Sequence, residues 1–263
     1  MAGVTQKLAE TLKQGKSVLS TWSTLADPAT AALLMRENFD SVVIDMQHGA
    51  MDYHAAAPAI SLIAAAGKPS IVRVPLGDFA LVSRLADAGA AAIIAPMINT
   101  AEDARQLVAA TKYPPLGERS WGPNAVEGLT GLTGESYFRA ANAFTLCFAM
   151  FETQAAFDNM AEILAVPGLD GVFVGPADLS IGLSAGKELN PLAPTVTRTL
   201  KVLLEKTRAA GKYMAAYAPT PARAAEHQHD GYAIVALPGD AGFMLAGART
   251  ALAELHHASG QPA

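Results

Sequence analysis

Residues 174–180 combine the end of an apolar run, a Gly-Pro turn and a carboxylate at the start of a helix. The preceding residues, 171–174, predict a short buried strand, and residues 178–180 predict the opening of a helical turn. A helix start presents unpaired backbone N–H groups, so a substrate carboxylate can rest there while the Asp178 side chain faces a cation. The alternative is that Asp178 is a simple helix cap. The segment therefore predicts either an anion and metal site or a capped turn.

Polar side chains also stand at the ends of three other predicted strands. Asp45 ends one strand and His48 follows it, Arg73 lies near the end of the next strand, and Glu152 ends a later one. In a parallel barrel the catalytic residues come from the carboxyl ends of the strands and the loops that follow them. We therefore expect three carboxylates, an imidazole and a guanidinium to converge.

Glu152 and Asp178 come from consecutive strand–helix units, so both can project into one space. Two carboxylates leave the remaining positions of an octahedral divalent ion for substrate and water, and Mg²⁺ or Mn²⁺ fits that set best. The alternative is that Glu152 caps the helix predicted to begin at Thr153. If both carboxylates are free of helix capping, the pair predicts a site for a divalent cation.

The remaining polar residues fit proton transfer and charge stabilisation. Asp45 lies three residues before His48 and could orient it as an acid or base; alternatively, His48 is a hydrogen-bonded surface group. Arg73, on a buried strand, needs an anionic partner, and an oxygen that becomes negative on a bound substrate would serve. Trp22 either walls the substrate pocket or belongs to the core.

The lysines argue against a Schiff-base mechanism, which needs a desolvated lysine at a strand end. Lys68 and Lys212 precede their strands, and Lys112 and Lys187 are expected in polar loops. The single cysteine, Cys147, lies in an apolar run and is expected to be a buried, inert thiol. Five histidines, residues 54, 227, 229, 256 and 257, lie in helical or surface-like contexts, and no role is expected for them.

These residues require a parallel sheet to bring them together. Short β-rich runs alternate with longer Ala- and Leu-rich helical stretches along the whole chain, which is typical of βα units. Eight apolar runs predict strands at 17–22, 41–45, 70–74, 91–95, 145–152, 171–175, 213–217 and 232–237. Eight strands predict a closed (β/α)₈ TIM barrel as one α/β domain over residues 1–263. A doubly wound open sheet is the alternative, but no G-x-G-x-x-G motif follows an early strand.

Two segments depart from the strand–helix rhythm. Residues 113–135 are rich in Gly and Pro and too long for a plain loop, so they are expected to cover a site or meet a partner subunit, and Arg119 within them could touch either. The tail, 239–258, predicts an apolar helix that either closes the barrel or packs on a neighbour.

Composition points to small-molecule chemistry. The chain has 263 residues, of which 51% are hydrophobic and 16% charged, and its net charge is −5. It carries no basic patch interleaved with aromatic residues, so nucleic-acid binding is not expected. Its first residues do not show the pattern of a leader, and no apolar stretch free of turn residues reaches membrane length. We expect a cytoplasmic protein with no membrane partner.

Five segments closely resemble the HpcH/HpaI aldolase family, which comprises metal-dependent class II pyruvate aldolases such as 4-hydroxy-2-oxoheptanedioate aldolase. They are IDMQHG at 44–49, VRVP at 72–75, YPPLGER at 113–119, FET at 151–153 and GLDGVFVGPADLS at 168–180. The resemblance extends over nearly the whole chain in consistent order, and the last block is highly specific.

The resemblance implies roles for the residues at the strand ends. Glu152 and Asp178 would hold Mg²⁺, Mn²⁺ or Co²⁺, and a 2-oxo acid such as pyruvate would chelate the metal. The turn through Gly175, Pro176, Ala177 and Asp178 would cradle the carboxylate, which the amides of residues 177 and 178 would receive. Arg73 would stabilise the enolate oxygen, and His48, with Asp45 nearby, would transfer protons directly or through a metal-bound water.

The resemblance also implies a homo-oligomer. In the family, an aspartate in the helix after the third strand reaches a neighbouring subunit's site and partners its histidine, and Asp87 matches it. Members are commonly hexamers, trimers of dimers that exchange their last helix. The chain departs from the family at Gln47, Met150 and Trp121, where Glu, Gln and a smaller residue are usual, which affects the expected acceptor specificity.

The expected function is reversible aldol cleavage of 4-hydroxy-2-oxo acids to pyruvate or hydroxypyruvate and an aldehyde, through a metal-stabilised enolate. One alternative is another lyase reaction on the same enolate, such as oxaloacetate decarboxylation. A second is a non-catalytic protein that binds a 2-oxo acid. The set Asp45, His48, Arg73, Glu152 and Asp178 argues against the second, because a pure binder needs no proton-transfer residue beside a metal.

Overall fold

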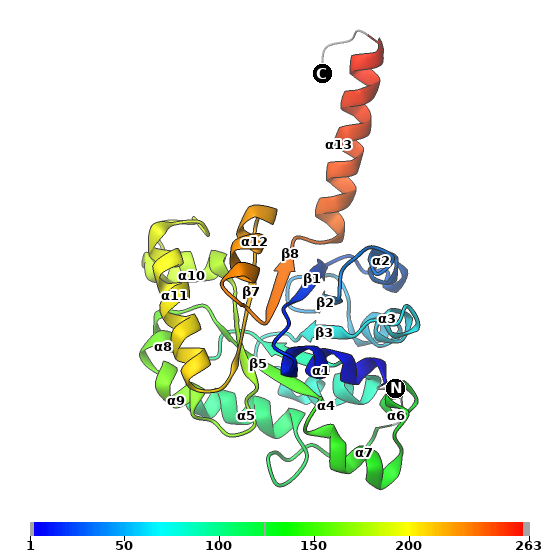
Figure 1. Cartoon of the computed structure of the whole chain (residues 1–263), viewed down its shortest axis with the longest axis vertical. Coiled ribbons are helices and arrows are strands. Elements are labelled where there is room, and N and C mark those ends of the chain that lie inside the picture. The colour runs from blue at the N-terminus through cyan, green and yellow to red at the C-terminus, as the bar shows by residue number, and fades with distance from the viewer. Residues whose placement is uncertain (1–2, 124, 260–263) are drawn as a thin grey trace.

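In the computed structural model, which describes residues 3–123 and 125–259, eight parallel strands close into a barrel (Figure 1). Each strand pairs with its neighbours in chain order, and β1 pairs with β8 to complete the ring. The predicted (β/α)₈ barrel is therefore confirmed, and the open sheet is excluded. The strands are β1 Val18–Ser23, β2 Ser41–Asp45, β3 Ser70–Arg73, β4 Ala92–Ala95, β5 Leu146–Phe151, β6 Gly171–Val174, β7 Tyr213–Tyr217 and β8 Ile234–Leu237.

Helices alternate with these strands along the chain and surround the barrel (Figure 1). Their bounds are η1 Val4–Gln6, α1 Lys7–Lys13, α2 Pro28–Leu34, α3 Tyr53–Ala65, α4 Phe79–Ala88, α5 Ala101–Thr111, α6 Val126–Thr130, α7 Gly134–Ala141, α8 Gln154–Asp158, α9 Met160–Leu164, α10 Pro176–Leu183, α11 Pro194–Ala209, α12 Pro221–His229 and α13 Asp240–Ser259. None of the helices in the described ranges is long and apolar enough to cross a membrane.

The strands form because their residues are apolar on both faces. All six residues of β5 and all five of β2 are buried. Neighbouring residues of one strand contribute to different clusters: Val43 belongs to the cluster that contains Trp22 and Phe173, whereas Val42 and Ile44 belong to the cluster that packs against the outer helices. This alternation is expected for a barrel strand, whose side chains point inward and outward in turn.

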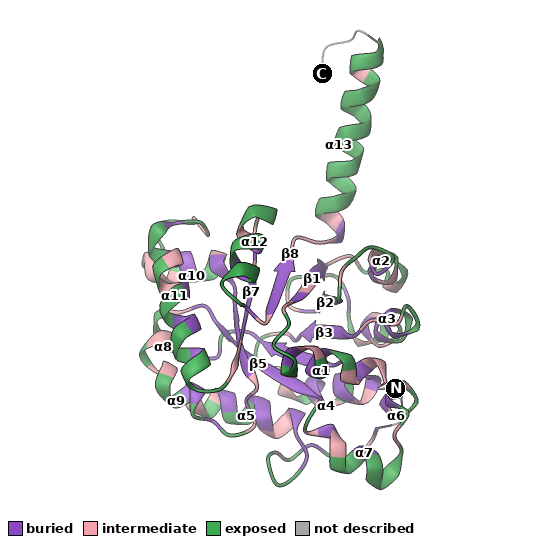
Figure 2. Cartoon of the chain, viewed as in Figure 1, coloured by how far each residue is buried: buried purple, intermediate pink, exposed green. Residues whose placement is uncertain are grey.

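The last helix, α13, projects away from the barrel (Figure 1), and nearly all of its length is exposed (Figure 2). It is fixed at its first residue, since the buried Asp240 carboxylate accepts hydrogen bonds from Ser23 Oγ and from the Thr24 backbone N–H. The expectation that this tail might close the barrel is wrong, because pairing of β1 with β8 already closes it. The helix is free to meet a neighbour.

The Gly-rich segment 113–135 contains α6 and the start of α7. Its residue Arg119 donates to the carbonyl of Lys112, whose ammonium group donates to the carbonyl of Thr145, just before β5 begins. The segment therefore lies near the amino ends of the strands, on the opposite side of the barrel from the predicted catalytic residues. From this position the segment does not cover the predicted catalytic residues of its own chain.

Candidate active site

The barrel brings the predicted polar residues to one rim. Asp45 is the last residue of β2 and Arg73 the last residue of β3, and the parallel register pairs them directly. Glu152 follows the last residue of β5, and Gly175 follows β6 and precedes α10. Since all these strands are parallel, their ends face the same side of the barrel. The predicted convergence at the carboxyl ends of the strands is observed.

Asp45 and Arg73 form a buried, two-pronged ion pair. Arg73 Nε donates to Asp45 Oδ1 at 2.9 Å, and Arg73 Nη2 donates to Oδ2 at 2.7 Å. Burial acts to raise the pKa of Asp45, but the hydrogen bonds and the charge of Arg73 outweigh it, so the pKa is lowered from its ordinary value. The Asp45 carboxyl is therefore ionised at neutral pH, and its two hydrogen bonds fix the plane of the guanidinium.

Trp22 supports this pair from inside the barrel. Its Nε1 donates to Asp45 Oδ2 at 3.0 Å, and the Arg73 guanidinium lies 5.0 Å from the centre of its ring. The ring also packs against Phe173 and Tyr217 at centroid distances of 5.6 and 5.8 Å. Trp22 is thus a buried side chain that orients Asp45 and Arg73, and it belongs to both the core and the site.

The third nitrogen of the guanidinium has only a weak partner. Arg73 Nη1 lies 4.0 Å from the sulfur of Met150, and a thioether is a weak acceptor. The sequence predicted that the anionic partner of Arg73 would come from a substrate. Asp45 takes that role for Nε and Nη2, and Nη1 is the donor left to face a substrate oxygen.

Asp45 contacts the backbone of His48, whereas the spacing of the two residues suggested that it would orient the imidazole. Asp45 Oδ1 accepts hydrogen bonds from the backbone N–H groups of Gln47 and His48, at 3.0 and 3.2 Å. The carboxylate therefore shapes the loop after β2 and does not hold the imidazole, because Arg73 and Trp22 occupy its oxygens. The His48 side chain is exposed at the rim.

Glu152 is buried, and its surroundings exclude a capping role. Helix α8 begins at Gln154, and its cap is the Thr153 hydroxyl, which accepts from Ala156 N–H at 3.1 Å. Glu152 Oε2 instead accepts from the backbone N–H of Met97 at 3.2 Å. Burial, opposed in part by this hydrogen bond, raises the pKa of Glu152 to about 7. A nearby cation would offset that burial and favour the ionised carboxylate.

Asp178 is also not a cap. Helix α10 begins at Pro176, two residues earlier than predicted, because proline fits the first helical position. Gly175 is the cap residue and Asp178 is the third residue of the helix, with its side chain exposed. The free N–H groups of the first turn and the carboxylate therefore share one end of the helix, as the anion and metal interpretation requires.

Gly175 lets the helix start approach Glu152. A Cβ atom at residue 175 would lie 2.7 Å from Glu152 Oε1 and 2.8 Å from Met150 Cε, closer than real Cβ contacts. No other residue fits without moving the Glu152 carboxylate. Since the Met150 sulfur also lies 4.0 Å from Arg73 Nη1, the guanidinium, the buried carboxylate and the start of α10 lie near one another.

The donor set fits a divalent cation that keeps sites open for substrate. Burial is the main reason why the pKa of Glu152 is raised, and the negative charge of Asp178 acts in the same direction. Among residues 3–123 and 125–259, no cluster of three or more His, Cys, Asp or Glu side chains could hold a metal. Two carboxylate oxygen ligands suit a hard divalent cation that completes its shell with water or substrate.

Some predicted residues lie elsewhere. Asp87 is near the end of α4, and the segment that follows it bonds to Ser70, the first residue of β3. It therefore lies near the amino ends of the strands, away from His48, and pairs with Arg119. Lys112 was expected in a polar loop but is buried, where it pairs with Asp170. It too lies away from the catalytic rim, so no Schiff-base role arises.

Two further expectations concern buried groups. His227, expected in a helical or surface-like context, lies on α12 and is 3% exposed, and its ring stacks on Tyr232 with 4.3 Å between centroids. Cys147 is buried as predicted, and burial raises the pKa of its thiol to about 12, so the thiol is inert. Met97 was not predicted at all. Its backbone N–H donates to Glu152, and its φ of 54° lies in the left-handed region, two features for which its residue type gives no signal.

Comparison with known proteins shows the family of the chain. Residues 18–246 match the HpcH/HpaI aldolase/citrate lyase family, and the chain belongs to it. The chain is 34% identical over 241 residues to a hydroxypyruvate/pyruvate aldolase of Rhizorhabdus wittichii, covering 92% of this chain and 95% of the relative. It is 32% identical over 244 residues to a 2-dehydro-3,6-dideoxy-6-sulfogluconate aldolase of Pseudomonas putida, covering 93% and 94%.

A solved structure shows the same fold. The crystal structure of an HpcH/HpaI aldolase from Desulfitobacterium hafniense superposes with a TM-score of 0.86 at 26% identity, covering 94% of this chain and 95% of that one. The resemblance read from the sequence motifs is therefore confirmed. The chain is an enzyme of the aldolase type, a carbon–carbon lyase on a (β/α)₈ barrel.

Proposed function

We propose that this enzyme catalyses reversible aldol cleavage of 4-hydroxy-2-oxo acids. The proton of the 4-hydroxyl group leaves, the C3–C4 bond breaks, and its electron pair moves toward the 2-oxo oxygen. C4 departs as an aldehyde, and protonation of the enolate at C3 gives pyruvate, or hydroxypyruvate when C3 carries a hydroxyl group. The name of the Rhizorhabdus wittichii relative, hydroxypyruvate/pyruvate aldolase, supports these donors.

The residues around Gly175 bind and orient the 2-oxo acid. The carboxylate meets the backbone N–H groups of Ala177 and Asp178 in the first turn of α10, beside the turn at Gly175 and Pro176. The 2-oxo oxygen faces Arg73 Nη1, the guanidinium nitrogen that Asp45 leaves free. As the oxygen becomes an enolate, a fixed positive charge in this buried place stabilises it by several kcal/mol.

Glu152 and Asp178 would hold the divalent cation, with Mg²⁺, Mn²⁺ or Co²⁺ as the candidates, and when bound it supplies Lewis-acid polarisation of the 2-oxo group. Met97 N–H keeps the Glu152 carboxylate turned toward Gly175. These side chains therefore set where the donor binds.

His48 is the residue for proton transfer. Its side chain is exposed at the rim where the aldehyde would leave. Asp45 fixes the loop that contains His48, because its carboxylate accepts a hydrogen bond from the His48 backbone N–H. An imidazole there can take the 4-hydroxyl proton and return it in the condensation direction. A second copy of this chain would supply Asp87 to orient the imidazole, since each chain carries its own Asp87 near the other end of its barrel.

The observation that carries the proposal is the closeness of the ends of β3 and β5 to the helix start at Gly175. Arg73 Nη1 lies 4.0 Å from the Met150 sulfur, and the Met150 and Glu152 side chains fill the place where a Cβ of residue 175 would stand, so one small substrate can meet a guanidinium, a buried carboxylate and a helix start together. This favours enolate chemistry on a 2-oxo acid, and the aldolase names of the relatives favour an aldehyde as the second product.

The direct test measures pyruvate released from a panel of 4-hydroxy-2-oxo acids, with oxaloacetate as the competing substrate. We expect faster release from the hydroxy acids than from oxaloacetate, and loss of release after chelation. Arg73→Ala should lower kcat strongly, whereas Arg105→Ala, an exposed arginine of α5 paired with Glu102, should not. Faster decay of oxaloacetate, or full activity after chelation, would contradict the proposal.

We also propose that residues 1–263 act as one domain in a cytoplasmic homo-oligomer, a hexamer that exchanges α13. The projecting helix exposes large apolar side chains that water disfavours, and a second copy would cover them. They are Phe243, Met244, Leu245, Leu252 and Leu255.

A further inference from the structure

The Asp240 carboxylate binds the start of α13 to the end of β1, and the residue is 1% exposed. Oδ1 accepts from Thr24 N–H at 3.0 Å, from Thr24 Oγ1 at 2.9 Å and from Ala241 N–H at 2.8 Å. Oδ2 accepts from Ser23 Oγ at 2.8 Å and from Leu25 N–H at 3.1 Å. Burial acts to raise the pKa of Asp240, but these hydrogen bonds outweigh it, so the pKa is lowered and the group is ionised at neutral pH.

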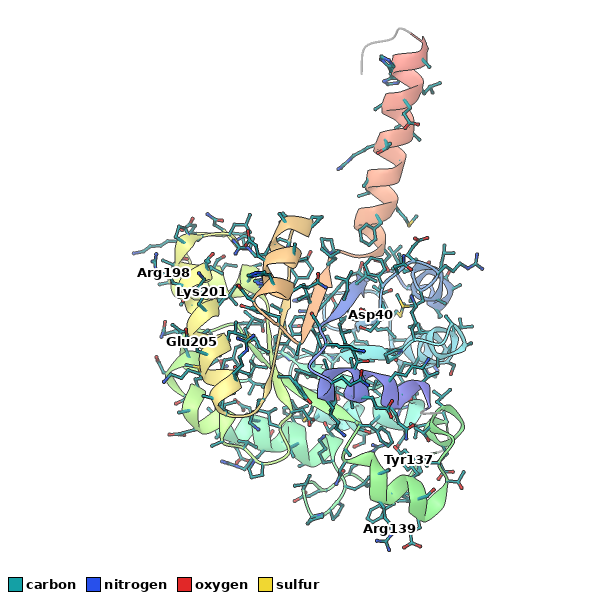
Figure 3. All side chains as sticks on the ribbon, viewed as in Figure 1. Asp40, Tyr137, Arg139, Arg198, Lys201 and Glu205 are labelled. Atoms are coloured by element: carbon teal, nitrogen blue, oxygen red, sulfur yellow. The ribbon has the colours of Figure 1, made fainter. Side chains whose placement is uncertain are left out.

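Capping of α13 does not account for these contacts. A capping side chain accepts from an N–H two or three residues further on, whereas the contact of Asp240 within α13 is to Ala241, the next residue. Beyond its first turn, α13 has no described segment beside it (Figure 3), so the neighbours that the carboxylate can order lie on the barrel. The other donors come from residues 23–25, and the carboxylate therefore organises the rim at the end of β1.

The anchored residues 23–25 in turn hold the loop that contains His48. The Thr24 carbonyl accepts from Ala50 N–H at 2.8 Å, two residues after His48. A Cβ at Gly49 would lie 3.2 Å from Thr24 Cα and 2.1 Å from the Asp45 carbonyl oxygen, so the loop packs directly against the anchored residues and only glycine fits. Since Asp45 Oδ1 accepts from His48 N–H, the loop is fixed at His48 itself and again at Ala50.

The connection that leads into Asp240 also packs against Trp22. A Cβ at Gly239 would lie 1.5 Å from the Trp22 carbonyl oxygen, so the two backbones are in direct contact. The Trp22 ring donates to Asp45, which binds Arg73. The start of α13 therefore contacts the backbone on which this part of the site is built.

We infer that Asp240 is a positioning residue of the active site: by holding residues 23–25 it fixes, through the Thr24 carbonyl, the loop that places the His48 imidazole. The inference rests on the proposed function, in which His48 transfers the proton. The role needs a carboxylate, because donors meet both of its oxygens and an amide would replace one oxygen by an NH₂ group that cannot accept. Loss of the charge should loosen the rim without removing any group that meets the substrate.

Asp240→Asn in the full-length enzyme tests this inference. We expect kcat for cleavage of a 4-hydroxy-2-oxo acid to fall on the order of tenfold with little change in KM, because a misplaced proton-transfer group slows the reaction more than it weakens binding. Beside His48→Ala, assayed at high enzyme concentration, the same substitution should cause no further loss, because Asp240 acts through His48. Asp27→Asn is the matched control, since the Asp27 carboxylate caps α2 in the same connection, accepting from Ala29 N–H at 2.9 Å, and it should keep full activity.

Hydrogen–deuterium exchange, measured by mass spectrometry, tests the loop independently of activity. The peptide that covers residues 46–52 should take up deuterium faster in Asp240→Asn than in the wild type, because Ala50 N–H loses a fixed partner. Its uptake should be unchanged in Asp27→Asn. If Asp240→Asn does not fold, Thr24→Val replaces it; this variant removes one hydroxyl contact with Asp240 and should show smaller changes of the same kind.

Equal losses of kcat with His or Ala at residue 48 would overturn the inference, because Asp240 would then act only on the fold. Unchanged deuterium uptake at residues 46–52 would overturn it as well. A wild-type enzyme without aldolase activity would overturn the proposed function, whereas an active wild type that Asp240→Asn matches in kcat would overturn only the role of Asp240.

Discussion

The Asp45 carboxylate binds Arg73 through Nε and Nη2 and leaves Nη1 as the outward donor of the guanidinium. The two hydrogen bonds hold the Arg73 guanidinium in one orientation. It depends on the register of β2 with β3, which places the two residues side by side. The strand register of the barrel therefore determines the orientation of Arg73 Nη1.

Asp45→Asn should disable Arg73 without removing it. The amide keeps the size of the side chain but leaves the buried guanidinium without its counter-charge, and breaking a buried pair in this way costs about 3 kcal/mol. We expect a large loss of kcat/KM and a lower free energy of unfolding. Asp158→Asn, which changes an exposed residue of α8, is the control. Unchanged kinetics in the Asp45 variant would show that Arg73 needs no anchor.

Glu152→Gln should weaken metal binding before it affects folding. The amide can still accept from Met97 N–H, so the loop after β4 keeps its contact, but the negative charge is gone. Calorimetric titration of the metal-free protein with Mn²⁺ should show at least about tenfold weaker binding. Glu162→Gln, at an exposed position of α9, should bind as the wild type does. Equal affinity of all three proteins would remove Glu152 from the metal site.

Substitutions on α13 should change the size of the assembly. Leu252→Glu combined with Leu255→Glu places charges on α13 at two leucines that are 55% and 60% exposed. Light scattering should then report a smaller particle than the wild type. Leu189→Glu is the matched control, because Leu189 is 69% exposed in the connection between α10 and α11. The same mass for all variants would contradict assembly through α13.

His227 predicts a pH-dependent part of the stability. Burial, assisted by the charge of Arg223, lowers its pKa from 6.5 to about 4 in the folded chain. Between these values the unfolded chain binds a proton that the folded chain does not, so stability is lost as the pH falls. The loss reaches about 3 kcal/mol near pH 4.

Denaturant unfolding of the wild type and His227→Phe at several pH values measures this loss. Phenylalanine keeps a ring against Tyr232 but takes up no proton. The difference in unfolding free energy should shift in favour of the variant as the pH falls from 6.5 to 4. A difference that stays constant with pH would show that His227 titrates normally.

The strands were predictable because each is a continuous apolar run between turn residues, and their predicted limits differ from the observed ones by two residues or fewer. The start of α10 was displaced because Pro176 begins the helix rather than preceding it. The placement of Glu152 and Arg73 followed from their strand ends. The local sequence pattern and the barrel topology were sufficient to predict the positions of these two residues.

The contacts of each side chain were less predictable, because they depend on distances between segments that are far apart in the sequence. Asp45 is three residues from His48 in the sequence, yet its side chain is taken up by Arg73, 28 residues away. Met97 reaches Glu152 through its backbone, which no residue type reveals. His227 was given only a helical or surface-like context from the sequence, and its packing against Tyr232 across the chain fold buries it.

The most direct measurement of the central claim is exchange of the C3 protons of pyruvate with deuterium in D₂O, followed by NMR without any aldehyde. Exchange reports enolate formation alone. We predict rapid exchange by the wild type with Mn²⁺ or Mg²⁺, slow exchange after chelation, and slow exchange by Arg73→Ala with the metal restored. Exchange that persists unchanged in the Arg73 variant, or without metal, would contradict the account of this site.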